Sequence, residues 1–192
     1  MHHRRLAAFL MGAWLAGSVL MAAMAAHNLR AVDSLLEAPP YGLAKPIEAI
    51  GHAGARALLR HEAAELNRWG FDVWEWAQLV IGPALVATIA SRRPHARLVL
   101  ALSSVMLGAA VIQHWGIAPA LAGLVSLADA AALGQPSPEH SRFAGLHFTY
   151  MSIEAIKFAC GLVVLVTLLR HSTAPAPNAA ATLPHKRIRA HG

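Results

Sequence analysis

Residues 147–169 read HFTYMSIEAIKFACGLVVLVTLL, an apolar run that carries one glutamate and one lysine. A helix rises about 1.5 Å per residue, so a run of this length crosses the roughly 30 Å hydrocarbon core of a bilayer. Five residues recur at steps of three and four and share one helical face: His147, Tyr150, Glu154, Lys157 and Gly161. Because a charged pair facing lipid is costly, this face is expected to point into a bundle, where Glu154 and Lys157 can pair.

Three further apolar runs of similar length occur at residues 6–26, 70–90 and 98–121. Of the 192 residues, 56% are hydrophobic and only 14% are charged, which is too apolar for most soluble folds. The sequence therefore predicts an all-α integral membrane protein, a four-helix bundle that forms one domain over residues 1–170. The single cysteine, Cys160, excludes an internal disulfide and a thiolate metal cluster.

The distribution of lysine and arginine predicts the orientation of the spans. Basic residues gather before the first span, in the link after residue 90 and beyond residue 169, whereas the two other loops hold most of the acidic residues. By the positive-inside rule both termini are cytoplasmic, and we expect the inner membrane of a bacterial cell. The net charge of +6 forms no basic stripe, so no nucleic-acid partner is expected. The expected partners are the lipid bilayer and either a second copy of the chain or another membrane protein.

The first apolar run has two interpretations. Its basic start and the small residues at 22–26 resemble a secretory signal peptide with a cleavage site. The run is longer than a usual signal core, however, and Ala8, Gly12 and Ala16 form a ladder of small residues that would let helices approach closely. We expect a retained first span, with cleavage near His27 as the alternative.

The long link from residue 27 to residue 69 predicts an external amphipathic helix between spans one and two. Pro39 and Pro40 interrupt the chain, and after Pro46 apolar residues return at helical spacing. This helix either lies in the membrane interface or rigidly extends the second span. The segment 171–192 is rich in alanine and proline, and we expect a disordered basic cytoplasmic tail there.

Three spans place a polar residue at one depth. Glu75 lies 15 residues before residue 90, Gln113 lies 15 after residue 98, and Glu154 lies 15 before residue 169. At about 1.5 Å per residue, the backbones of all three residues lie about 22 Å from the cytoplasmic edge, in the outer third of the core. The candidate ligand-binding residues in and beside this layer are Glu75, Gln113, His114, His147, Tyr150, Glu154 and Lys157.

Two functions fit such a layer. It can form an outward-opening site that binds or moves a cation, a proton or a small polar ligand. Alternatively, the polar contacts hold the helices together, and the protein is a structural or accessory subunit that docks a membrane partner.

Metal binding stays open, because His114 and His147 with Glu75 or Glu154 supply at most three ligands and no HExxH-type spacing occurs. A haem with two histidine ligands is disfavoured, since these histidines differ in depth by about two turns. The sequence contains no nucleophile elbow, P-loop or dinucleotide fingerprint. We therefore expect no enzymatic activity and no cofactor.

Short motifs along residues 6–169 resemble a known family. They are Gly12-Ala-Trp-Leu-Ala-Gly17, Glu65-Leu-Asn-Arg-Trp69 leading into Trp74-Glu-Trp-Ala-Gln78, and Leu146-His147 followed by Glu154 and Gly161. On these motifs the chain is similar to the transmembrane protein 205-like proteins, a family of four-span domains of unknown function. The resemblance implies a four-helix inner-membrane protein and no particular reaction. The Glu154–Lys157 pair is not carried over from the family.

Overall fold

The computed structural model describes residues 2–91, 97–131 and 138–170, and this part of the chain contains helices and no strand. The helices are α1 (His2–Glu37), α2 (Tyr41–Ala90), α3 (Arg97–Ile112), a π-helix (Gln113–Ile117), α4 (Ala118–Ala131) and α5 (Pro138–Arg170). Four helical stretches are long and apolar enough to cross a membrane: His2–Glu37, Tyr41–Ala90, Arg97–Leu124 and Ser141–Arg170. The predicted fold class, an all-α four-helix bundle, is confirmed.

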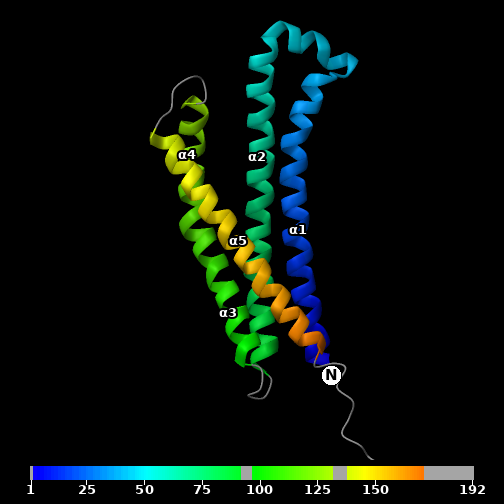
Figure 1. The fold of residues 1–192 in the computed structure, drawn as a ribbon, viewed down its shortest axis with the longest axis vertical. Helices are drawn as coiled ribbons and strands as arrows, with labels where there is room; N and C mark the ends of the chain where they lie inside the picture. Colours follow the sequence, from blue (N-terminus) through cyan, green and yellow to red (C-terminus); the bar gives the residue numbers. More distant parts are fainter. Residues whose placement is uncertain (1, 92–96, 132–137, 171–192) are drawn as a thin grey trace, which may run out of the picture.

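The chain passes along the long axis of the molecule four times (Figure 1). α1 and α2 form an antiparallel pair, α3 returns beside α2, and α4, which follows it, packs against α5. α5 then crosses the bundle diagonally from α4 toward the start of α1, contacting α3 on the way. We call the end where α1 passes into α2 the hairpin end, and the end where α1 starts the terminal end.

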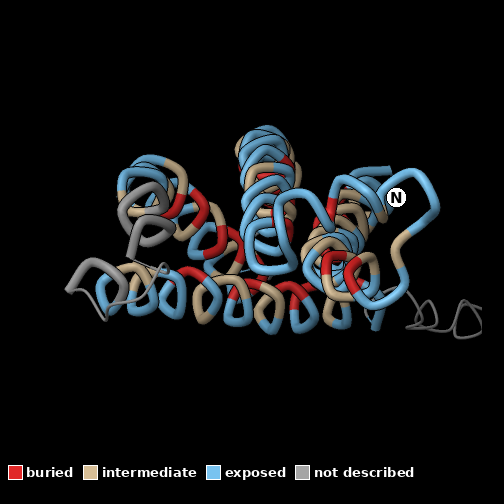
Figure 2. Tube along the Cα trace, turned by 90° about the horizontal axis from the view of Figure 1, so that it is seen from above, coloured by how far each residue is buried: buried red, intermediate tan, exposed pale blue. Residues whose placement is uncertain are grey.

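Large side chains of α1 fill the core against glycines of the neighbouring helices. Met11, Trp14 and Leu15 are buried, and Figure 2 shows buried residues on the helix sides that face one another. A Cβ atom on Gly82 of α2 would lie 3.2 Å from the Trp14 ring, and one on Gly161 of α5 would lie 2.9 Å from Leu15. These two glycines therefore permit the close approach of α2 and α5 to α1.

The predicted packing ladder on α1 is wrong. A Cβ atom on Gly12 would meet no neighbouring helix within 4 Å in the described part of the chain, and Ala16 is exposed. The physical reason is that α1 turns large apolar residues toward glycines of α2 and α5, and its own small residue at a close contact is Gly17, which lies outside the predicted ladder and packs against Trp74 of α2. A ladder of small residues on one helix is thus not needed for close packing here.

The link after the first span is helical rather than irregular. α1 continues to Glu37 and α2 begins at Tyr41, so only residues 38–40 separate the two helices. The two segments pack around a small core of their own at the hairpin end: Val32, Leu36, Ile47, Ala55 and Ala63. Asp33 and Arg56 form an ion pair across this pair of segments at 3.3 Å.

Of the two alternatives for the external helix, the structure shows a rigid extension of the second span. A bend at Gly51, whose φ is +74°, directs the first turns of α2 across the hairpin end (Figure 1). Glycine adopts this backbone conformation without a steric penalty. From the bend onward α2 is helical to Ala90, so the external segment and the second span are one helix.

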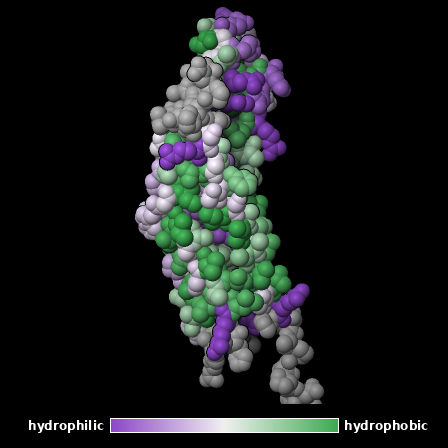
Figure 3. Space-filling view, turned by 60° about the vertical axis from the view of Figure 1, so that its left-hand side comes forward, coloured by the Kyte–Doolittle hydropathy of each residue, from purple (hydrophilic) through white to green (hydrophobic). Residues whose placement is uncertain are grey.

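Helical structure also extends beyond the third and fourth predicted spans. α4 reaches Ala131 and α5 begins at Pro138, so helical structure continues well past residue 121 and begins well before residue 147. Residues 132–137 and the predicted tail at 171–192 lie outside the described residues. In Figure 3 hydrophobic residues cover the middle of the visible face, and hydrophilic residues gather toward the hairpin end. This distribution fits a bundle whose middle lies in lipid.

Candidate ligand-binding site

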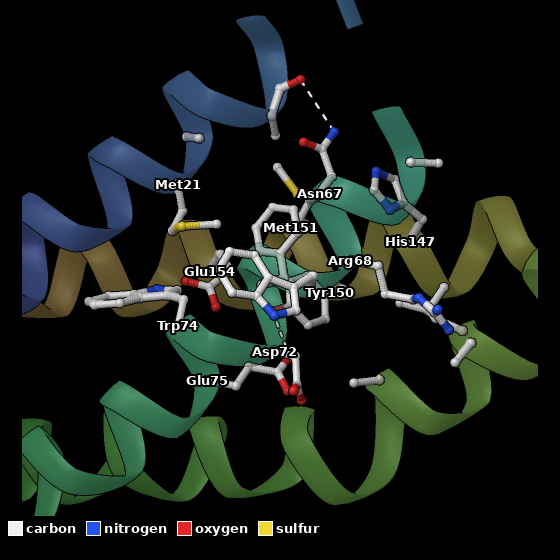
Figure 4. Close-up of a pocket in the computed structure, with 18 of the residues that line it drawn as sticks. Met21, Asn67, Arg68, Asp72, Trp74, Glu75, His147, Tyr150, Met151 and Glu154 are labelled. Carbon is white, nitrogen blue, oxygen red and sulfur yellow. Dashed lines mark hydrogen bonds between the residues drawn. The ribbon is translucent and has the colours of Figure 1, made fainter. Parts of the chain in front are cut away.

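A cavity of about 1410 Å³ lies between the helices, and α1, α2, the π-helix, α4 and α5 all contribute to its wall. Most of its lining is apolar or aromatic, and several acidic residues interrupt this wall. In Figure 4 the carboxylates of Asp72 and Glu75 lie next to each other, and Tyr150 points toward them. Glu154 also lines the cavity.

The centre of the site is the Glu75 carboxylate of α2, which is only 3% exposed. Its Oε1 atom accepts a 2.7 Å hydrogen bond from the Tyr150 hydroxyl of α5. Its Oε2 atom lies 2.9 Å from Nδ1 of His114 in the π-helix. A buried carboxylate needs such partners because leaving it unpaired in a low-dielectric interior is costly.

Gln113 ties the π-helix to α5 at the same level. Its amide is fully buried, and Nε2 donates a 3.2 Å hydrogen bond to the backbone carbonyl of Tyr150. Glu75 and Gln113 therefore meet at one level, as their equal spacing from the predicted edges indicated, but α5 contributes Tyr150 there, one turn away from the predicted Glu154.

The π-helix sets the direction of these two residues and has a local cause. The backbone N–H of Ala118 bonds to the carbonyl of Gln113, five residues earlier. Pro119 follows directly, and it has no N–H with which to continue the α-helical pattern. The wide turn therefore absorbs the proline, and it places Gln113 and His114 on the side that faces α2 and α5.

A second polar cluster lies one turn closer to the terminal end on α5. Lys157 is 2% exposed, and its Nζ atom lies 2.7 Å from Glu154 Oε1. The same Nζ donates a 2.5 Å hydrogen bond to Oε1 of Gln78 and lies 5.9 Å from the centre of the Trp14 ring. The expected pair of Glu154 and Lys157 is confirmed, and it connects α5 to both α1 and α2.

His147 occupies a different part of the cavity from the other candidates. It lines the wall, but it is exposed, and its ring stacks on Phe143 at 5.9 Å. The structure thus gathers six of the seven candidates into two clusters, one around Glu75 and one around Lys157, and leaves His147 apart. Whether any of them binds a ligand stays a prediction.

Three residues at the site were not among the sequence candidates: Asp72, Gln78 and Trp14. Asp72, Glu75 and Gln78 follow one another at steps of three on α2, and this spacing was the signal that could have found them. Trp14 lies in the middle of the first span, away from the membrane interfaces where tryptophan is enriched. A tryptophan in the middle of a predicted span was therefore the sequence feature that could have identified Trp14.

One donor set in this site suits a metal ion. Asp72, Glu75 and His114 each offer a ligand atom, and these atoms all lie within 4.8 Å of one another. Asp72 is exposed, His114 is half-buried and Glu75 is buried. The trio thus leads from the open side of the cavity to its interior.

The chain was also compared with family models, with curated proteins and with solved structures. None of these three comparisons gave a match. The functional proposals therefore rest on the residues of the cavity.

Proposed function

We propose that this protein is a multi-pass inner-membrane protein that binds a cationic ligand in the cavity between its helices. The observation that supports this most strongly is the charge of the wall. Two of its acidic residues, Asp72 and Glu75, lie together on the wall of a largely apolar cavity. The proposal is binding rather than catalysis.

The ion pairs of the described residues indicate why Asp72 and Glu75, rather than the other acidic residues of the cavity, would attract the cation. Glu65 pairs with Arg68, and Glu154 pairs with Lys157. Glu75 has a histidine as its ion-pair partner, and a histidine contributes positive charge only when it is protonated. Negative charge thus remains at this part of the cavity wall, and the apolar surroundings strengthen its attraction for a cation.

The cavity offers a path to this charge from the hairpin end. Its lining on α2 runs from Ala64 to Glu75, which corresponds to about 16 Å along a helix. Ala64 lies in the external part of α2, whereas Glu75 lies in the apolar span. With both termini in the cytoplasm, as the basic residues indicate, the cavity would open on the outer side of the membrane.

The alternative function, a structural or accessory subunit, is favoured by a different observation. Lys157, Glu154, Gln78 and Trp14 form a cluster in which the buried ammonium already has its partners. We assign this cluster to helix packing and the Glu75 cluster to the ligand. Membership of the transmembrane protein 205-like family, and a homo-oligomeric state, also stay proposals.

The test compares ligand-induced stabilisation in matched variants of the purified full chain. We expect Zn²⁺, Mn²⁺ or tetramethylammonium to raise the apparent Tm of the wild type, since a ligand at 100 times its Kd adds about 2.7 kcal/mol to stability. Glu75→Gln should lose this stabilisation. Glu48→Gln, which removes the same charge from an exposed position of the external segment, should keep it.

Native mass spectrometry of protein extracted gently from its own membrane provides the second measurement. A retained ion or small cationic molecule supports the proposal. A bare chain, together with equal Tm values for the wild type and Glu75→Gln in every cation, would overturn the proposal and favour the structural alternative.

A further inference from the structure

We infer that the cation is a divalent first-row transition-metal ion, held by Asp72, Glu75 and His114. This inference rests on the proposed function and names the ligand class of the same site. It depends on distances, on the donor set and on the groups that support the ligands.

The spacing of the donor atoms matches that of metal ligands. Two adjacent ligands that each lie about 2.1 Å from an ion are about 3.0 Å apart in octahedral geometry and about 3.4 Å apart in tetrahedral geometry. His114 Nδ1 and Glu75 Oε2 are 2.9 Å apart. An ion can therefore replace the proton shared by these two atoms with little movement of either side chain. The donor atom of Asp72 lies within 4.8 Å of both, so a small side-chain rotation completes the set.

The types of donor select the class of ion. One imidazole nitrogen and two carboxylate oxygens suit Mn²⁺, Fe²⁺, Co²⁺ or Zn²⁺, whereas Mg²⁺ and Ca²⁺ prefer oxygen donors alone. Three protein ligands leave at least one coordination position for water, as in metal sites that exchange a ligand. Such a site fits reversible binding better than permanent structural binding.

Neighbouring groups hold two of the ligands in place. Tyr150 donates its hydroxyl proton to Oε1 of Glu75 and so leaves Oε2 directed at His114. The rings of Trp76 and Trp115 contact the His114 ring edge to face, with ring centres 4.6 Å and 4.9 Å away. Groups that orient metal ligands in this way typically change metal affinity by about 10-fold to 100-fold.

The other polar groups of the cavity are less suitable as metal ligands. The carboxylate of Glu154 is neutralised by Lys157, whose positive charge would repel an ion. His147 stacks on Phe143 and lies outside the trio. An organic cation also fits the cavity volume of about 1410 Å³, and the test therefore includes one.

The experiment uses the purified full chain, stripped with a chelator and then titrated with Co²⁺. Bound Co²⁺ has visible absorption bands that report nitrogen and oxygen coordination directly. We expect one such site in the wild type, at least tenfold weaker binding in Asp72→Asn, and loss of the bands in Glu75→Gln and His114→Asn. Zn²⁺ should displace Co²⁺, and a tenfold excess of Mg²⁺ should not.

His147→Asn is the matched control, because it removes a histidine from the same cavity but not from the trio. It should keep the wild-type bands, and all variants should elute as the wild type does in size-exclusion chromatography. The histidines at residues 2 and 3 are exposed and offer further nitrogen donors, so the comparison is made between variants rather than on total metal. Tyr150→Phe should keep the site but weaken Co²⁺ binding by about tenfold.

Two outcomes overturn the metal inference and separate it from the proposed function. If Co²⁺ and Zn²⁺ do not bind, but tetramethylammonium stabilises the wild type and not Glu75→Gln, the metal inference fails and cation binding stands. If no cation stabilises the wild type, both fail. Equal loss of Co²⁺ bands in His147→Asn and His114→Asn would also reject the trio as the site.

Discussion

The Tyr150 hydroxyl donates a 2.7 Å hydrogen bond to Glu75 Oε1 and so joins α5 to α2 in the interior of the bundle. These residues are 75 positions apart in the sequence. Tyr150 is 5% exposed and Glu75 is 3% exposed, so water does not replace this contact. One hydroxyl therefore fixes the Glu75 carboxylate and joins two helices.

Tyr150→Phe should destabilise the protein. The variant keeps the ring but leaves a carboxylate oxygen of Glu75 without its donor, and an unpaired buried acceptor costs about 1–3 kcal/mol. The free energy of unfolding in a mixed-micelle denaturant titration measures the loss. Tyr41→Phe is the control, because Tyr41 is 95% exposed and should tolerate the same change. Equal unfolding free energies for the two variants would contradict the assignment.

Lys157→Met should be among the most destabilising single changes in the bundle. It leaves Glu154 without its cation, and breaking a buried ion pair from one side costs about 3–5 kcal/mol. Replacing both partners, in Glu154→Leu with Lys157→Leu, should cost much less, because no uncompensated charge remains. The same unfolding titration distinguishes the two cases. A double variant less stable than Lys157→Met would show that the pair does more than hold the helices together.

Gly17→Ala should disturb the wall of the cavity. The added Cβ atom would lie 2.2 Å from the Trp74 ring, and this rigid ring cannot yield without moving as a whole. Overpacking of this kind costs about 1–3 kcal/mol. Gly12→Ala is the control on the same helix, since nothing in the described part of the chain lies within 4 Å of its Cβ position. We expect a shift in tryptophan fluorescence for Gly17→Ala alone.

Pro119→Ala should separate stability from metal binding. The restored N–H lets the chain form α-helical bonds in place of the wide turn at Gln113–Ile117, and this change would rotate His114 away from Glu75. We expect Co²⁺ binding to fall at least tenfold, while the free energy of unfolding stays equal or rises. Unchanged Co²⁺ bands would show that the proline does not determine the position of His114.

Cysteine labelling in intact cells tests the orientation. In a Cys160→Ala background, Glu48→Cys should react with a membrane-impermeant maleimide, and Ser91→Cys should react only after the cells are opened. Glu48 lies near the hairpin end and Ser91 near the terminal end, and both are exposed. The reverse pattern would place the cavity opening in the cytoplasm.

The sequence predicts the polar layer to within one helical turn because depth in a membrane follows from residue count. Glu75, Gln113 and Glu154 were placed at one level by their distance from the predicted edges, whereas the residue of α5 that meets Glu75 and Gln113 is Tyr150, one turn away from Glu154. The direction of His114 around its helix could not be predicted in the same way. It depends on the wide turn before Pro119, which changes the periodicity on which face arguments rely.

Other differences have equally specific causes. The charged residues after Ala26 end the apolar run but not the helix, because water solvates their side chains while the backbone continues α1 to Glu37. Hydropathy locates the membrane boundary and says little about where a helix stops. The ladder of Ala8, Gly12 and Ala16 was a misleading signal, because close packing needs a small residue on one partner only. Against Trp14 and Leu15 of α1 that partner is α2 or α5, and against Trp74 of α2 it is Gly17 of α1.

The continuity of α2 beyond the bend at Gly51 has a mechanical consequence. The external segment and the residues Asp72, Glu75 and Gln78 belong to one continuous helix. A rotation of its external part about the helix axis would therefore move all three side chains together. Turning the helix would withdraw Glu75 from Tyr150 and His114 in one motion, and Gln78 from Lys157 as well. Any molecule that binds the external segment and turns it would therefore move Glu75 and Gln78 away from their hydrogen-bond partners.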